Sequence, residues 1–178
     1  GDSRSGRSNA DDLVGRILLG SILAGYSPDI NNAMDMTPVD YIAKAMVYLS
    51  SQTASVGKVF HLLNPRPVHW NDIFDRASEV GYPTQKLDFT NWVDALEKYA
   101  DPTANPLAPM IAFFHLRFAR RMLGISDSHF KALGTANTRN GMIDSGITCP
   151  PVDQDLISTF LVEFVKTGLL HETPQVIA

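Results

Sequence analysis

The 178 residues carry 15 lysine and arginine side chains against 19 aspartates and glutamates, a formal net charge of −4, which argues against generic electrostatic binding to nucleic acid. Hydrophobic residues make up 44% of the chain and charged residues 19%, as is ordinary for a globular protein, and no apolar run approaches the roughly 20 residues that span a bilayer. The single cysteine, Cys149, excludes an internal disulfide, and with no signal peptide in view we expect a cytoplasmic protein.

The opening stretch, GDSRSGRS at residues 1–8, differs at one position from the phosphate-binding P-loop pattern G-x-x-x-x-G-K-[ST]. Gly1, Gly6 and Ser8 match the pattern, and Arg7 replaces its lysine. A P-loop joins a buried strand to a helix, but no strand precedes this stretch, and a planar guanidinium does not reproduce the point charge of lysine. We therefore expect a tight turn that enters a helix. Because the sequence lacks an initiator methionine and starts inside this motif, we also expect a piece of a longer protein.

Four amphipathic helices are predicted in the first hundred residues, because apolar residues recur there every three or four positions. Ser8 or Asn9 can cap the first helix and Gly25 can end it, while Thr37 and Pro38 give a start signal for the second. The predicted helices cover residues 9–24, 38–49, 69–80 and 91–100, and between them lie a loop with Pro28 and three extended pieces at 34–36, 58–63 (KVFHLL) and 86–89 (KLDF).

A proline-rich stretch at residues 101–109 is the predicted joint between two parts of the chain. We expect residues 1–100 to mix helices with short strands, and residues 101–178 to form a helical subdomain. The polar stretch 135–147 is predicted to be a loop. Further helices are expected over residues 107–118, over 126–133 and over a final stretch that ends at Gly168. The fold class that follows is an α/β fragment, predominantly helical, with about three short strands.

No metal site and no nucleophile are predicted. Cys149 is followed by Pro150 and has neither an adjacent base nor a helix N-terminus to activate it, so we interpret it as a structural cysteine. The histidines show no ligand spacing of the H-x-x-x-H or HExxH kind. They lie at positions 61, 69, 115, 129 and 171.

Tyr82 and Lys86 have the Tyr-x-x-x-Lys spacing by which short-chain dehydrogenases place a catalytic acid and its supporting ammonium on one helix face. Pro83 follows the tyrosine and an extended piece follows the lysine, so the two side chains should not share a helix face and the spacing is interpreted as chance. No G-x-x-G-x-x-G follows a strand anywhere in the chain. We therefore predict no catalytic and no cofactor-binding residue among these 178.

A basic cluster is formed by Arg117, Arg120 and Arg121, which fall on one side of a helix. Two interpretations stay open from the sequence. The arginines can form a solvated helix face, or they can bind an acidic partner or a phosphate.

Four stretches, taken in order, resemble the thioester reductase domains that terminate nonribosomal peptide and polyketide assembly lines, which are related to α-aminoadipate and carboxylic acid reductases. The stretches are GDSRSGRSNADDLVGRIL, DMTPVDYIAKAMVYLS, GKVFHLLNPRPVHWNDIF and GITCPPVDQDLISTFLVEFVKTGLL. The resemblance implies the C-terminal, substrate-binding part of an extended Rossmann-like reductase, with residues 1–100 as the remnant of the Rossmann-like part. It further implies that NADPH and the Thr-Tyr-Lys catalytic set belong to an N-terminal half that these residues do not include, so the fragment alone is expected to bind no cofactor and to be inactive.

In this family the thioester of a phosphopantetheine-linked acyl or peptidyl chain is reduced to an aldehyde or alcohol. The resemblance therefore implies an acyl or peptidyl carrier protein and the N-terminal Rossmann half as partners. Asn9, Met36 and Trp70 are predicted to line the substrate channel, because they start or end elements where a cleft would open. The three clustered arginines are predicted to dock the carrier or its phosphate. Two alternatives stay open: a non-catalytic carrier-docking module, and part of an extended short-chain epimerase or dehydratase acting on nucleotide sugars.

Overall fold

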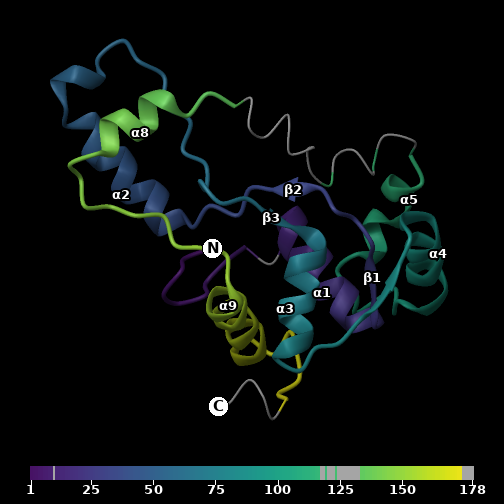
Figure 1. Cartoon of the computed structure of the whole chain (residues 1–178). Helices are drawn as coiled ribbons and strands as arrows, with labels where there is room; N and C mark the ends of the chain where they lie inside the picture. Colours follow the sequence, from purple (N-terminus) through teal and green to yellow (C-terminus); the bar gives the residue numbers. More distant parts are fainter. Residues whose placement is uncertain (10, 117–118, 120–122, 124–132, 174–178) are drawn as a thin grey trace.

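The computed structural model describes residues 1–9, 11–116, 119, 123 and 133–173 (Figure 1). The described elements are mostly helices, with four short strands, so the predicted fold class is confirmed. The helices are α1 (Leu13–Ala24), α2 (Val39–Ser50), α3 (Trp70–Glu79), α4 (Phe89–Tyr99), α5 (Ile111–Phe114), α8 (Ala136–Met142) and α9 (Gln154–Lys166), with 3₁₀ turns at Thr53–Ser55 and Ala108–Met110. None of these helices is long and apolar enough to cross a bilayer.

The strands form two small sheets. In the first, β1 (Tyr26–Pro28) lies parallel to β4 (Gln85–Leu87), with Ser27 opposite Lys86. In the second, β2 (Ala33–Met34) lies antiparallel to β3 (Val68–His69). The sequence predicted a loop with Pro28 where β1 lies. Proline is tolerated at the end of β1 because both strands of a two-stranded sheet are edge strands.

The helix ends follow capping chemistry. The carboxylate of Asp12 accepts the backbone N–H of Gly15 at 2.6 Å, so this residue caps α1 and the prediction of Ser8 or Asn9 was wrong. Gly25 ends the helix in the left-handed region at φ 77°, as predicted. Pro38, not Thr37, occupies the cap position of α2, because the threonine hydroxyl donates to the carboxylate of Asp35 instead.

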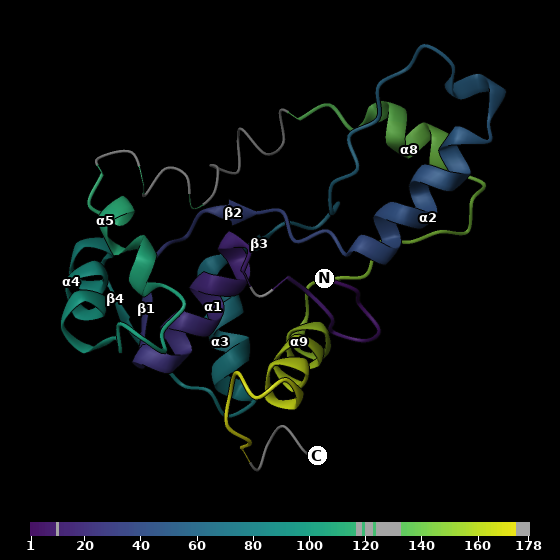
Figure 2. The same cartoon turned by 180° about the vertical axis from the view of Figure 1, so that it is seen from behind.

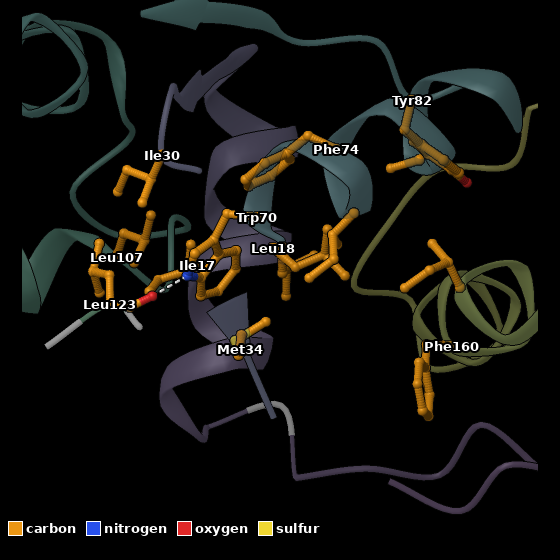
Figure 3. Close-up of a cluster of buried hydrophobic side chains, with 14 of the residues drawn as sticks. Ile17, Leu18, Ile30, Met34, Trp70, Phe74, Tyr82, Leu107, Leu123 and Phe160 are labelled. Atoms are coloured by element: carbon orange, nitrogen blue, oxygen red, sulfur yellow. Dashed lines mark hydrogen bonds between the residues drawn. The ribbon is translucent and has the colours of Figure 1, made fainter. Parts of the chain in front are cut away.

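One hydrophobic core lies where α1, α3, α4 and α9 meet (Figures 1 and 2). Trp70 stands at the centre of this cluster in Figure 3, and its ring stacks on Phe74 with 6.0 Å between centroids. Leu107 and Phe160 belong to the same cluster, so side chains from both sides of residue 100 share one core. The division into parts at 1–100 and 101–178 stays a prediction.

A second, smaller cluster joins α2 to α8 at the far end of the molecule from α4 (Figures 1 and 2). Tyr41, Ala45 and Cys149 are its buried members, and Leu62 and Met142 pack against them. We call residues 39–63 together with 133–149 the α2–α8 lobe.

Two predictions within this lobe were wrong. Residues 58–63 were predicted to be a strand, but they pair with no strand of the described chain. Residues 135–147 were predicted to be a loop, yet α8 occupies 136–142. The polar composition of α8 conceals the helix, which packs so closely on α2 that a Cβ at Gly141 would lie 2.7 Å from Leu49 Cδ2. The predicted helix over 107–118 is described only as α5 and a preceding 3₁₀ turn, and the one over 126–133 falls almost wholly outside the described residues.

Candidate functional site

A hollow lies where the opening segment, the start of α1, the end of β2 and α9 meet. Two adjoining pockets form it, and both are lined by Gly1, Asp12, Val14, Met36 and Phe160. The larger pocket has a cavity volume of about 180 Å³, enough for a small group or an extended arm rather than a whole drug-sized ligand. We call the two pockets together the Met36 hollow.

The backbone around Met36 is fixed by a buried asparagine. Asn64 is fully buried, and its side-chain amide donates to the carbonyl of Met36 at 3.4 Å and to that of Pro150 at 3.1 Å. Its side-chain oxygen accepts the N–H of Arg66 at 3.0 Å, and its own N–H donates to the Asp35 carboxylate at 3.0 Å. One side chain thus ties three chain segments together beside the hollow.

The opening segment is a closed turn and not a P-loop. The carboxylate of Asp2 accepts the backbone N–H and the hydroxyl of Ser5 at 2.8 and 3.0 Å, and also the N–H of Arg4. These bonds, led by the Ser5 N–H, lower the pKa of Asp2 to about 2. Gly6, at φ 72°, lies so close to α9 that a Cβ there would approach the Thr159 carbonyl oxygen to 2.3 Å. Asp2 therefore bonds within the turn, and the turn packs on α9.

The turn is also fastened to the start of α2. Ser3 donates its backbone N–H and its hydroxyl to the two carboxylate oxygens of Asp40, at 2.9 and 3.0 Å. Burial raises the pKa of Asp40, but the Ser3 hydrogen bonds outweigh it, so the net pKa lies below the ordinary value of 3.8. Lys44, one helical turn along, adds an ion pair at 3.6 Å. This fastening holds one wall of the Met36 hollow.

We expect this fastening to be lost in acid. Because the folded-state pKa of Asp40 is lowered, its contribution is present above the unfolded value of 3.8 and disappears as the pH falls through the folded value. The amide resonance of Ser3 should therefore titrate with an apparent pKa below 3.8. Asp40→Asn should remove this titration, whereas the matched substitution Asp94→Asn, on α4, should leave it unchanged. An apparent pKa at or above 3.8 would contradict the assignment.

The structure places the three predicted channel residues differently. Met36 lines the hollow. Asn9 is exposed next to the hollow, where its side-chain oxygen accepts the N–H of Asp11 at 3.0 Å. Trp70 is only 1% exposed, and its indole N–H donates to the backbone carbonyl of Leu123 (Figure 3). Substrate contact by these residues stays a prediction, and for Trp70 the structure shows a core role.

The arginine cluster and the Tyr-x-x-x-Lys spacing were the other features singled out in the sequence. Arg117, Arg120 and Arg121 lie outside the described residues. Tyr82 is buried and donates its hydroxyl to the His171 carbonyl at 2.7 Å, and burial raises its pKa.

Lys86 pairs with Asp75 at 2.7 Å. The tyrosine and lysine of the Tyr-x-x-x-Lys spacing therefore have separate partners. Burial raises the pKa of Cys149 to about 11, so its thiol stays protonated at neutral pH, as a structural cysteine requires. Within the described ranges, no three histidine, cysteine or acidic side chains gather as metal ligands would.

Sequence reasoning missed the polar residues that shape the hollow, namely Asp35, Asp40 and Asn64. Asn64 had a signal, since it is a polar residue between the apolar run ending at Leu63 and Pro65. That position was interpreted only as a break in the chain. Each of the three also bonds a residue 28 or more positions away, and a local sequence pattern does not predict such long-range pairings.

No protein-family model matches the chain. Several curated proteins are similar to it in sequence. It is 32% identical to one of the linear gramicidin synthase proteins of Brevibacillus parabrevis over 97% of its own length and 3% of that protein. It is 36% identical to the nonribosomal peptide synthetase asaC of Aspergillus flavus, over 96% of this chain and 17% of that one. The chain thus spans only a small part of these curated relatives.

Solved structures agree. The terminal R domain from the myxalamid PKS-NRPS biosynthetic pathway superimposes with a TM-score of 0.81 at 31% identity, covering 96% of this chain and 43% of that one. A thiolation-reductase di-domain from an archaeal nonribosomal peptide synthetase shares the fold, with a TM-score of 0.68 at 18% identity over 94% of this chain and 34% of that one.

Proposed function

We propose that this chain, which is the C-terminal portion of a terminal reductase (R) domain of the nonribosomal peptide and polyketide synthetase type, supplies the substrate-binding part of a thioester reductase. The similarity to R domains over nearly its whole length carries this proposal. The Met36 hollow supports it, because a small site walled in part by the apolar side chains of Val14, Met36 and Phe160 suits an extended acyl or phosphopantetheine chain.

The chemistry we propose for the complete domain is hydride transfer from NADPH to a carrier-bound thioester, with release of an aldehyde or alcohol. The residues of this chain do not fit the cofactor's usual site. None of the left-handed glycines in the described chain stands in a turn from a strand into a helix, which is the geometry that holds a dinucleotide. We therefore assign NADPH to the rest of the domain.

The proposed contribution of this chain is to position the substrate. The reacting carbon must lie about 3–3.5 Å from the hydride donor, and a misplacement of about 1 Å can cost about 100-fold in rate. Val14, Met36 and Phe160 would hold the apolar chain and keep water away from it. Asn64 and Asp40 would keep the walls in place, since each joins segments distant in sequence.

A carrier protein is the proposed partner. One protein of the same fold is a thiolation-reductase di-domain, which supports a carrier beside the reductase. The arginines at 117, 120 and 121 stay the proposed contact with the acidic carrier or its phosphate.

The test is a substitution in the parent reductase domain, by which we mean the complete reductase domain that contains this chain. Met36→Ala should raise the KM for a carrier-bound acyl thioester about tenfold with little change in kcat, because about 1.4 kcal/mol of apolar contact is lost. Leu23→Ala, at an exposed position on α1 outside the hollow, is the matched control and should behave as wild type.

Three outcomes would contradict the proposal. An unchanged KM would remove the hollow from the substrate path. A parent domain that binds the carrier but never consumes its thioester would be a docking module. Turnover of a nucleotide sugar instead of a thioester would indicate the epimerase or dehydratase alternative.

A further inference from the structure

A second cavity lies within the α2–α8 lobe. It is formed by the last turn of α2, the 3₁₀ turn that follows, and α8, which lies beside α2 in both views (Figures 1 and 2). Its volume is about 270 Å³, close to the lower end of the roughly 300–1,000 Å³ range of small-molecule sites. It shares no lining residue with the Met36 hollow. Pro38 lines the hollow and Tyr48 lines this cavity, so the two are about 15 Å apart along α2. We call it the Lys58 cavity.

One wall of the Lys58 cavity is aromatic. Phe60 and Tyr48, both half-buried, line it together with Gly141 of α8. A Cβ at Gly141 would lie 3.2 Å from Phe60 Cε1, so the ring packs directly on the backbone of the helix. The side-chain amide of Asn137 donates to the carbonyl of Val59 at 2.9 Å and fixes the same segment to α8. The aromatic wall is therefore in place before a ligand enters, which lowers the cost of binding.

Two side chains of opposite charge line the same cavity. Lys58 and Asp144 are the charged residues among the described residues that line it. They do not pair with each other, and no hydrogen bond or ion pair joins either side chain to another residue of the described chain. Both side chains are exposed, so a ligand can reach them from solvent. The cavity thus offers one cation and one anion, each available to a ligand.

Uncharged polar groups lie beside these two charges. The carboxamide of Asn140 and the hydroxyl of Tyr48 also line the cavity, and neither forms a side-chain hydrogen bond within the described ranges. Gln52 lines it as well, and its amide has only a long bond of 3.4 Å to the Ser51 hydroxyl. Carboxamides and hydroxyls both donate and accept hydrogen bonds. They can therefore add bonds to either charged end of a polar ligand.

The pair of charges selects the class of ligand. A ligand with a single charge would be attracted by one of the two side chains and repelled by the other, whereas a zwitterion forms a charge-assisted hydrogen bond with each. We propose that the Lys58 cavity binds a free α-amino acid with an apolar side chain. Its carboxylate pairs with Lys58, its ammonium group pairs with Asp144, and its side chain packs on Phe60. This site goes beyond the proposed function, because it is separate from the Met36 hollow and needs neither cofactor nor carrier protein.

An NMR titration of the 178-residue chain with L-phenylalanine tests the proposal. The backbone amide resonances of Lys58, Asn140 and Gly141 should shift and saturate with a Kd of about 1 mM or lower. The amide of L-phenylalanine carries only the positive charge and its N-acetyl derivative only the negative one, so each should bind at least about tenfold more weakly. Calorimetric titration of the parent reductase domain should show the same preference for the zwitterion.

Matched substitutions locate the binding. Lys58→Gln and Asp144→Asn should each weaken the binding of L-phenylalanine at least about tenfold. Arg139→Gln, on α8 but outside the cavity lining, should bind it as the unchanged chain does.

Four results would overturn the proposal. They are shifts that do not saturate by about 20 mM, equal affinity for the two single-charge derivatives, unchanged affinity in both cavity variants, and binding by the chain but not by the parent domain. The last would mean that the cavity is filled in the complete domain. None of these measurements depends on turnover, so an inactive parent domain would refute the proposed function without affecting this result.

Discussion

Replacing Trp70 with alanine should lower the free energy of unfolding by about 4 kcal/mol, in the range for a buried tryptophan. The side chain is 1% exposed, stacks on Phe74 and donates its indole N–H to the Leu123 carbonyl. Truncation would leave both a cavity and an unsatisfied carbonyl. Urea denaturation of the 178-residue chain, followed by circular dichroism, measures the change.

Two comparisons keep the Trp70 result interpretable. Trp70→Phe keeps a six-membered aromatic ring but loses the pyrrole part of the indole with its N–H, so it should cost less than the alanine substitution, about 1–3 kcal/mol, and gives a folded variant if the alanine does not fold. Tyr99→Ala, at a 55% exposed position, should cost less than either. If Trp70→Ala lost less than about 1 kcal/mol, as a channel-lining side chain outside the core would, the core assignment would be wrong.

Asn64→Ala should cost about 3 kcal/mol of stability. The residue is fully buried and its side chain bonds the carbonyls of Met36 and Pro150 and the N–H of Arg66. Removing it leaves buried groups without partners, each worth about 1–3 kcal/mol. The same denaturation experiment measures this loss.

The matched control for this substitution is Asn91→Ala. Asn91 is exposed at the start of α4, and among the described residues its side-chain amide bonds the carboxylate of Asp88 alone, so its loss should cost less than about 1 kcal/mol. Asn64→Asp keeps the acceptor for Arg66 and loses the donor to the two carbonyls, so it should be destabilised at neutral pH as well. Equal stability of the Asn64 and Asn91 variants would show that the buried network does not join the segments.

How far the sequence predicts this fold depends on whether the signal is local. Helices α1, α3, α4 and α9 were predicted because the apolar spacing that indicates each of them lies within the element itself. The strand predicted at 58–63 failed for the opposite reason. Its residues have strand character, but strands exist only in pairs, and no partner strand lies in the described chain.

Helix α8 was missed because it buries little. Its sequence, ANTRNGM, has a single buried residue, Thr138, and its contact with α2 depends on the small size of Gly141. A polar stretch of seven residues has no apolar spacing from which this packing on α2 could be predicted. The predicted loop was thus a reasonable deduction from composition that a tertiary contact overrode.

The candidate site was predicted only in part. Met36 was chosen because it ends an extended piece, and it lies in the hollow. Asn64 and Asp40 were not chosen, since the bonds by which they join distant segments, to Met36 and Pro150 and to Ser3, span 28 to 86 positions. The resemblance to thioester reductases is confirmed by relatives and solved structures, whereas cofactor, product and carrier contacts stay proposals.

In the function proposed above, these residues hold a substrate for a reaction whose catalytic and cofactor-binding groups lie elsewhere in the domain. NADPH oxidation, followed by absorbance, tests this division of labour, with a carrier-bound acyl thioester as substrate for the parent reductase domain and for the 178-residue chain alone. We predict that the parent domain oxidises NADPH and consumes the thioester, and that the chain alone does neither. Thioester-dependent NADPH oxidation by the chain alone would contradict this division.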